Sequence, residues 1–179
     1  MKKTLLAVVV LLLAASTAFA QTFGTTSATT LTLTVGAEAS ISVDTSTPLT
    51  TTGTIFNDYG GTTSFTYKVR TGTSVNTAGV TLKITSDFGT AASGPSVANS
   101  GSTGDTLKYT CTATSSSATA CASAQTTSTT VATTVATFAA GAHSVKAGDS
   151  GSVIWDLVND PAYAVGSYNA TATFTISAT

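Results

Sequence analysis

The segment Ala170–Thr179 reads ATATFTISAT, and in it small or apolar side chains alternate with hydroxyl-bearing ones. Phe174 and Ile176 belong to the apolar set, whereas Thr173 and Thr175 belong to the polar set. A period of two is typical of a β-strand with one buried and one solvated face. We therefore expect Phe174 and Ile176 to lie in a core and the two threonines to lie at the surface.

A second alternating segment, Leu31–Val43, stands near the other terminus. Every odd position in it is apolar or small, so it predicts either one long strand or two strands in line, with Gly36 as the bend or bulge between them. Residues 21–30, QTFGTTSATT, offer few side chains to bury and are expected to form a flexible N-terminal arm. The folded domain is thus predicted at residues 31–179.

Between these two segments the same alternation recurs, with no convincing helix and no strict repeat that would favour a β-solenoid. The spacing predicts about seven to nine short strands, which is typical of an antiparallel sandwich or barrel, and a single all-β, immunoglobulin-like β-sandwich fits best. Gly89–Asp105 is expected to be a long loop, and Val153–Val158 a central strand. The predicted core side chains are Phe65, Tyr67, Leu82, Ile84, Trp155, Phe174 and Ile176.

Residues 1–20 have the three parts of a secretory signal peptide: a basic start, an apolar run, and small residues at Ala18 and Ala20. Cleavage is expected after Ala20. The alternative, an uncleaved membrane anchor, is less favoured because the apolar run is short for a span of about 20 residues. We expect a mature protein without a membrane span that is secreted, extracellular or held at the cell surface, after passing the periplasm if the cell is Gram-negative.

Charged residues make up only 8% of the chain, where about 25% is usual. Lys2 and Lys3 leave with the signal peptide, so five of the seven basic residues remain against eight acidic ones. Such a small number of cations cannot form a basic patch, so we do not expect nucleic acid as a partner. Hydroxyl groups take the place of charges on the solvated faces, and weak repulsion between copies favours self-association.

Cys111 and Cys121 are the only cysteines, and they lie symmetrically about Ser115–Ser117. A hairpin with its turn there would make them cross-strand partners, and an exported chain meets oxidising conditions, so we predict a disulfide. Free thiols or a metal pair are the less favoured alternatives. The alternation is not fully consistent with this hairpin, because Cys111 shares a face with Tyr109 whereas Cys121 is out of phase with the neighbouring alanines.

Residue types for catalysis and metal binding are scarce. His143 is the only histidine and Glu38 the only glutamate, which excludes a zinc site and a glutamate pair for glycoside hydrolysis. The acidic residues in or near loops are Asp58, Asp149, Asp156 and Asp160. They leave calcium open, although aspartate as a turn former is the simpler interpretation. We expect no enzyme, no catalytic residue, and no metal or other cofactor.

The signal peptide, the Thr-, Ala- and Gly-rich strands, the cysteine pair and the alternating terminal segments together resemble secreted bacterial fimbrial-type β-sandwich subunits. This resemblance implies a structural subunit of a surface filament, pilus or coat, in which an extended segment of one copy completes a neighbour's sheet. The implied partners are copies of the same chain or other surface proteins. The candidate donor is Thr30–Val43, above all Leu31, Leu33 and Val35. The terminal strand is then expected to be covered by the N-terminal segment of its own chain or of a neighbour.

A second interpretation comes from a different class of protein. The chain would be a monomeric exported module that binds a glycan or another surface ligand. It would use the loop Gly89–Asp105 together with Tyr59, Tyr163 and Tyr168.

Overall fold

The computed structural model describes residues 27–51, 53–74, 78–89, 94–99, 106–115 and 118–179. The chain divides into two compact units, one ending at Thr34 and one comprising Val35–Thr179. Residues 27–34 of the first unit have no regular secondary structure, and the second unit holds all the strands. The predicted signal peptide and residues 21–26 of the predicted arm lie outside the described residues.

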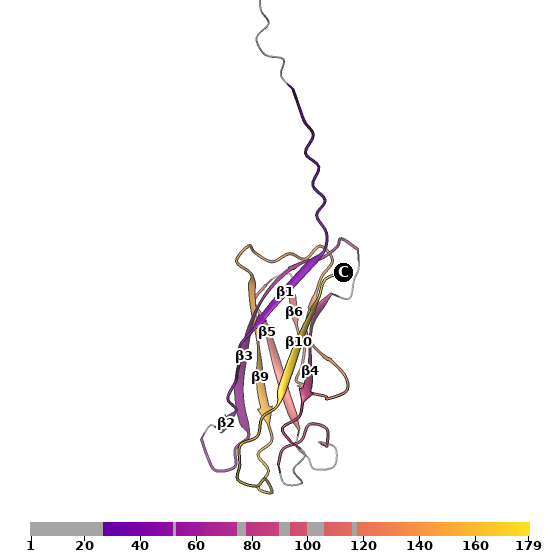
Figure 1. Ribbon diagram of the computed structural model, residues 1–179. Coiled ribbons are helices and arrows are strands. Elements are labelled where there is room, and N and C mark those ends of the chain that lie inside the picture. The colour runs from indigo at the N-terminus through magenta and orange to yellow at the C-terminus, as the bar shows by residue number, and fades with distance from the viewer. Residues whose placement is uncertain (1–26, 52, 75–77, 90–93, 100–105, 116–117) are drawn as a thin grey trace, which may run out of the picture. The chain divides into compact units, whose positions relative to one another are not determined.

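Two antiparallel sheets make up the second unit (Figure 1). The six-stranded sheet has the order β1 (Glu38–Val43), β3 (Tyr59–Arg70), β9 (Asp149–Leu157), β5 (Leu107–Ala113) and β7 (Gln125–Thr126), and β2 (Thr50–Thr51) also pairs with β3. The four-stranded sheet has the order β10 (Thr171–Ser177), β4 (Gly79–Ser86), β8 (Thr133–Phe138) and β6 (Ala118–Ala120). No described residue is helical, so the predicted all-β, antiparallel two-sheet architecture is confirmed.

The alternating positions of the sequence become the two faces of each sheet. In β3, Phe65 and Tyr67 point into the core, whereas Thr66 and Lys68 are exposed. The other predicted core residues on central strands, Leu82, Ile84 and Trp155, are also buried. Those on the terminal strand, Phe174 and Ile176, are only partly buried, while Thr173 and Thr175 are exposed. The predicted phase of β10 is therefore correct, and its burial is incomplete because β10 is an outer strand.

β9 is the central strand of its sheet, as predicted, because it pairs with β3 on one side and with β5 on the other. Its Trp155 is buried, with its ring edge-on to Tyr109 at a centroid distance of 5.7 Å. The indole Nε1 donates a hydrogen bond to Thr63 Oγ1 at 2.7 Å. The indole N–H is the one polar group of the tryptophan side chain, and this bond satisfies it after burial has removed it from water.

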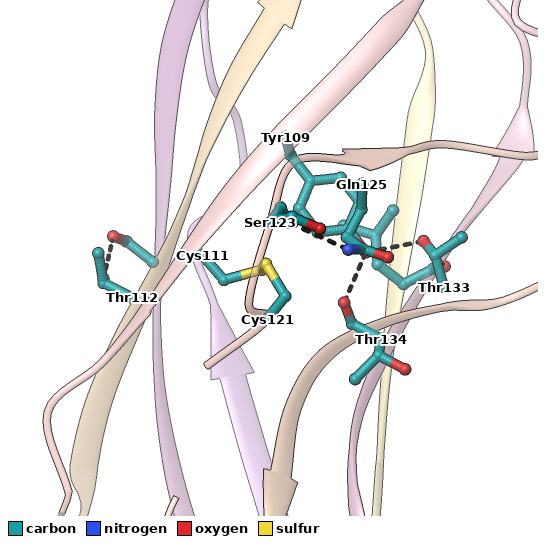
Figure 2. Close-up of a disulfide and its surroundings, with 10 residues drawn as sticks. Tyr109, Cys111, Thr112, Cys121, Ser123, Gln125, Thr133 and Thr134 are labelled. Atoms are coloured by element: carbon teal, nitrogen blue, oxygen red, sulfur yellow. Dashed lines mark hydrogen bonds between the residues drawn. A yellow bond between two sulfur atoms is a disulfide. The ribbon is translucent and has the colours of Figure 1, made fainter. Parts of the chain in front are cut away.

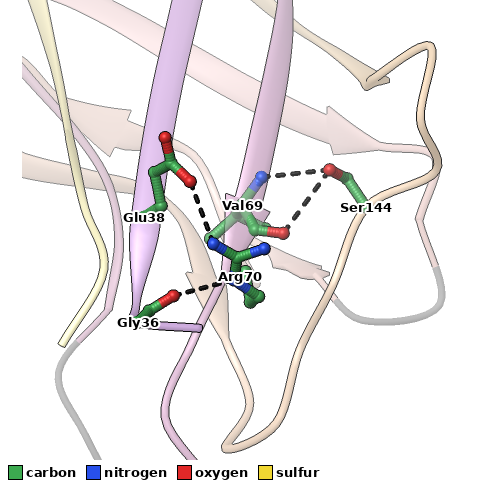
Figure 3. A network of polar contacts seen from close by, with 5 residues as sticks. All are labelled: Gly36, Glu38, Val69, Arg70 and Ser144. Atoms are coloured by element: carbon green, nitrogen blue, oxygen red, sulfur yellow. Dashed lines mark hydrogen bonds and ion pairs between the residues drawn. The ribbon is translucent and has the colours of Figure 1, made fainter. Parts of the chain in front are cut away.

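β1 begins only at Glu38, although the alternating pattern starts at Leu31. The register gives the reason: Glu38 pairs with Arg70, the last residue of β3, so the residues before it have no strand to pair with. Arg70 holds this point, since its Nε donates to the Gly36 carbonyl at 2.7 Å and its Nη2 lies 3.0 Å from Glu38 Oε2 (Figure 3). Gly36 is therefore not a bulge between two strands.

The predicted disulfide Cys111–Cys121 is present, but the predicted hairpin around it is wrong. β5 belongs to the six-stranded sheet and β6 to the four-stranded sheet, so the chain changes sheets between them. Cys121 follows the last residue of β6 and donates its N–H to Val135 of β8. Because it lies outside a strand, it need not follow the alternation of the alanines. The disulfide thus joins the two sheets (Figure 2).

Pairs of hydroxyl groups connect neighbouring strands on the solvated faces. Thr85 of β4 lies 2.8 Å from Thr173 of β10, and Thr112 of β5 lies 2.7 Å from Ser152 of β9, in each case between the two hydroxyl oxygens. These cross-strand contacts occupy positions where charged pairs are common in other proteins. On the solvated faces of the sheets, hydroxyl pairs thus take the place of charged pairs.

Candidate functional site

One side of the sandwich is open. Within the described residues, β1 pairs with β3 alone and β10 pairs with β4 alone. These two outer strands lie side by side (Figure 1). Each strand carries a row of partly buried apolar side chains that pack on the core, namely Ala39, Ile41 and Val43 on β1, and Ala172, Phe174 and Ile176 on β10. Side chains on the inner strand β4, such as Val80 and Leu82, are fully buried, whereas the described residues cover these outer rows only in part.

A cavity of about 850 Å³ lies between the end of β1 and the start of β10, and we call it the open-edge groove. Its walls are Val43–Leu49 on one side and Ala170–Phe174 on the other. Its floor consists of core side chains, namely Ile84, Leu107, Trp155 and Leu157. The groove therefore gives access to the interior of the sandwich, an unusual feature for a closed two-sheet fold.

Strand register places this groove at one end of the molecule, which we call the loop end. Tyr59 of β3 pairs with Leu157 of β9 there, and the segments 53–58 and 159–169 lie beyond them. Asn159 joins the two segments, since its backbone N–H donates to Asp58 Oδ1 and its Nδ2 donates to the Asn57 carbonyl, both at 3.0 Å. Glu38 and Arg70 mark the opposite end, which we call the β1-start end.

The lining of the groove mixes apolar side chains with polar ones, and several of the polar groups are hydrogen-bonded within the protein. Thr63 Oγ1 accepts the Trp155 indole bond and lies 2.6 Å from Thr47 Oγ1. The two charged side chains in the lining, Asp44 and Asp160, accept hydrogen bonds from the backbone of Ser64 and Ala162. An uncharged occupant that carries both apolar and hydroxyl side chains matches this surface.

Asp87 organises the described part of the predicted long loop, beside the groove. Its carboxylate accepts hydrogen bonds from the N–H groups of Phe88, Val97 and Ala98 and from the Ser96 hydroxyl, at 2.9–3.0 Å. Partial burial alone would raise the pKa of Asp87, but these four hydrogen bonds outweigh it and lower the pKa. The loop is thus fixed by a carboxylate that is favoured in its charged form.

The loop tyrosines predicted for ligand binding all line the groove. Two of them also support their own loop: the Tyr163 hydroxyl donates to the Val158 carbonyl at 3.2 Å, and the Tyr168 hydroxyl donates to the Ala164 carbonyl at 2.8 Å. The Tyr168 ring lies so close to Gly94 that a Cβ on this glycine would overlap with it. Tyr168 therefore connects the segment before β10 to the described part of the Gly89–Asp105 loop.

Of the predicted donor Thr30–Val43, the second half is β1 (Glu38–Val43), which pairs with β3 of its own chain, and only the part before it forms no strand. The side chains of Leu31 and Leu33 are 90% and 84% exposed, and Val35 is 56% exposed. Sequence reasoning missed the groove itself, including the wall Val43–Leu49 and Phe88. These residues become a surface feature only through contacts with distant segments, which no local pattern shows.

Metal ligands do not cluster in the described part of the chain: no three His, Cys, Asp or Glu side chains come together there. Asp160 accepts the N–H of Ala162 within its own turn, as turn-forming aspartates do, whereas Asp58 accepts the N–H of the distant Asn159. The described residues also contain no helix of the length and apolarity needed to cross a bilayer.

Comparison with known proteins identifies no relative: no protein-family model matches this chain, and no curated protein or solved structure is significantly similar to it.

Proposed function

We propose that this chain is a non-enzymatic structural subunit of a bacterial surface filament or coat, of the pilus or fimbrium type, and that its copies join by β-strand addition. One observation carries the proposal. The sandwich has an open side with two unpaired strand edges, partly buried apolar rows and a groove that reaches the core. The same chain also has an exposed, alternating segment at Leu31–Val35.

The finer architecture that we propose is an immunoglobulin-like sandwich without its closing strand. The order β1-β3-β9-β5 corresponds to strands A, B, E and D of that fold, and the pair β4-β10 corresponds to C and F. In the complete fold, strand G lies beside F. Among the described residues no strand takes this place beside β10, and a strand supplied by a neighbouring copy would complete the sheet.

The donor segment has the chemistry that the groove requires. An extended strand along β10 gains main-chain hydrogen bonds, and its alternate side chains point to the same face. Leu31, Leu33 and Val35 would then enter the groove, while Thr32 and Thr34 would face solvent. Each buried aliphatic side chain contributes about 1.5–3 kcal/mol. The segment 27–37 carries no charge, which suits a lining whose two charged side chains already accept hydrogen bonds within the protein.

An exported location forms part of the proposal. The predicted signal peptide would direct the chain out of the cytoplasm, and the Cys111–Cys121 disulfide is typical of an oxidising extracellular or periplasmic environment.

The proposal is tested on the mature chain, residues 21–179, by light scattering after size exclusion and by electron microscopy. We expect linear assemblies from the intact chain and folded monomers from a variant that lacks residues 21–36. A synthetic peptide of residues 27–37 should bind to this shortened variant and raise its melting temperature. The proposal is wrong if the deletion leaves the assembly state unchanged, or if the peptide does not bind.

A matched pair of variants checks which face of the segment acts. Leu31→Asn with Leu33→Asn should prevent assembly, because both side chains would have to enter the groove. Thr32→Asn with Thr34→Asn changes the other face of the same segment and should leave assembly intact. Equal behaviour of the two variants would contradict a strand that inserts with a fixed face.

The second candidate function, a monomeric module that binds a glycan or another surface ligand, is favoured by the aromatic lining of the groove. Trp155 in the floor provides a fluorescence signal for this test. Saturable quenching of the shortened variant by an oligosaccharide, together with no binding of peptide 27–37, would support the module. We expect the reverse result.

A further inference from the structure

The loop end of the sandwich exposes three large apolar side chains, which we call the apolar rim: Ile55, Phe56 and Val165. Ile55 and Phe56 are 88% and 60% exposed, and Val165 is fully exposed. Their loops are joined through the hydrogen bonds of Asn159. Phe56 and Val165 also line the open-edge groove, so the rim continues the surface of the groove.

The turn that carries Phe56 is held in a costly conformation. Phe56 has a φ of 61°, in the left-handed region that a bulky residue rarely adopts. Thr54 fixes the turn, because its hydroxyl donates to Asn57 Oδ1 at 2.9 Å and its carbonyl accepts the Asn57 N–H at 3.3 Å. Such a conformation, kept in order to expose a phenyl ring, points to a role for the ring outside its own subunit.

The length of the chain limits how far two joined subunits can be apart. If Val35 is the last donor side chain in a neighbour's groove, only Gly36 and Ala37 separate it from the first residue of β1, Glu38. Two extended residues span at most about 7 Å. Arg70 anchors both Gly36 and Glu38 to the donor's own sandwich (Figure 3). The donor's sandwich must therefore touch the acceptor where the donor strand leaves the groove.

The direction of the donor strand decides which end is touched. β10 begins at the loop end and runs towards the β1-start end, where Thr179 accepts a hydrogen bond from Gly72. A donor antiparallel to β10 leaves the groove at the loop end, and one parallel to β10 leaves it at the β1-start end. Only the antiparallel arrangement joins unlike ends, so that the same contact can repeat along an open chain. All strand pairs within the described sheets are likewise antiparallel.

We infer that the apolar rim is a second contact surface, against the β1-start end of the neighbouring copy whose N-terminal segment occupies the groove. This inference rests on the proposed function. The β1-start end has a matching apolar side chain, Val145, which is exposed and follows Ser144, whose hydroxyl accepts the N–H of Val69 of β3. The contact makes the joint between subunits stiff, whereas a donor strand alone would leave a hinge at Gly36 and Ala37.

The test compares two variants of the mature chain. In the rim variant, Ile55→Ser changes the rim residue that does not line the groove. In the control, Val131→Ser changes a similarly exposed aliphatic residue that does not line the groove. We expect the rim variant to need at least a tenfold higher concentration for half-maximal assembly and to give visibly more flexible chains, whereas the control should match the wild type.

Peptide binding separates this inference from the proposed function. The same Ile55→Ser substitution is also placed in the chain that lacks residues 21–36, because Ile55 lies outside the groove lining. Peptide 27–37 should bind to it with unchanged affinity and thereby show that the fold and the groove are intact. If the peptide binds and the rim variant assembles like the wild type, the inference is wrong and the proposed function stands. If the peptide does not bind to the shortened chain with its rim intact, the proposed function fails and the inference fails with it.

Discussion

The two long sides of the sandwich are built differently. On the closed side, the Cys111–Cys121 disulfide joins the sheets, and the buried Tyr109 hydroxyl donates to the Thr134 carbonyl at 3.0 Å and lies 2.7 Å from Thr133 Oγ1 (Figure 2). Burial raises the pKa of Tyr109, and the Thr133 bond offsets this only in part, so the phenol remains a neutral donor. On the open side, no disulfide in the described chain joins β1 to β10.

This difference shows how a sandwich can be stable and still incomplete. Covalent and hydrogen-bonded links between the sheets are concentrated at one side, so the other side can remain without a strand while the core stays ordered. The open side has partly buried apolar rows instead of links. If a strand binds as proposed, it would stabilise the side of the sandwich that has fewer links between the sheets.

The largest expected effect is a difference in lost stability between alanine substitutions at two phenylalanines of the four-stranded sheet. Phe138 of β8 is 5% exposed and packs on Tyr67, whereas Phe174 of the outer strand β10 is only partly buried beside Phe65. In the chain without residues 21–36, Phe138→Ala should cost about 3–5 kcal/mol of unfolding free energy. Phe174→Ala should cost about 1–2 kcal/mol, because solvent already reaches its ring. Urea unfolding measures both.

Adding peptide 27–37 sharpens this comparison. The peptide should cover Phe174, so the cost of Phe174→Ala should rise while the cost of Phe138→Ala stays the same. If both substitutions lower the unfolding free energy equally without peptide, the two sides are equally closed. In that case β10 does not need a covering strand.

The next effect concerns the disulfide on the closed side. Replacing both Cys111 and Cys121 by alanine should lower the unfolding free energy by about 2–3 kcal/mol, because the bond closes a short loop, with a sequence separation of 10 residues. Binding of peptide 27–37 to the shortened chain should not change, since the groove lies on the other side. Loss of peptide binding in a variant that remains folded would mean that the two sides are coupled.

The smallest effect is the pH dependence contributed by Asp87 beside the groove. Its pKa is lowered in the folded protein, so its hydrogen bonds add stability above the ordinary aspartate pKa of about 4. This contribution is lost as the pH falls from about 4 through the lowered pKa of Asp87 in the folded protein. The difference in unfolding free energy between the wild type and Asp87→Asn should therefore shrink as the pH falls below about 4.

Urea unfolding between about pH 2 and pH 7 measures this difference across the window in which aspartate titrates. The control is Asp156→Asn, which changes an exposed carboxylate on β9. A stability difference for Asp87→Asn that is constant over the whole range would contradict the proposed role of its charge.

Local patterns were enough to predict the faces of the strands. The alternation in β3, β4 and β10 identified which side chains point inwards, because a period of two depends only on the backbone. The presence of two cysteines in a chain with a predicted export signal was enough to predict the disulfide. These predictions succeeded because each depends on neighbouring residues or on composition.

The failures concern contacts between distant segments. The Ser- and Ala-rich residues around Ser115 fit a hairpin equally well, and only the pairing of β6 with β8 places the second strand in the other sheet. The alternation of Leu31–Ala37 is intact, but a strand needs a partner, and β3 ends at Arg70. The groove likewise combines segments from Val43 to Phe174, and no local pattern encodes it. The predicted location and function of the chain remain predictions.

The hydroxyl pairs between strands have a consequence for where this protein can work. Contacts such as Thr85–Thr173 and Thr112–Ser152 carry no net charge, so dissolved ions do not screen them as they screen surface ion pairs. In the described residues the only ion pair is the exposed Arg70–Glu38 contact, and exposed pairs of this kind contribute about 1 kcal/mol or less. The sheets should therefore keep nearly the same stability at low and at high salt concentration.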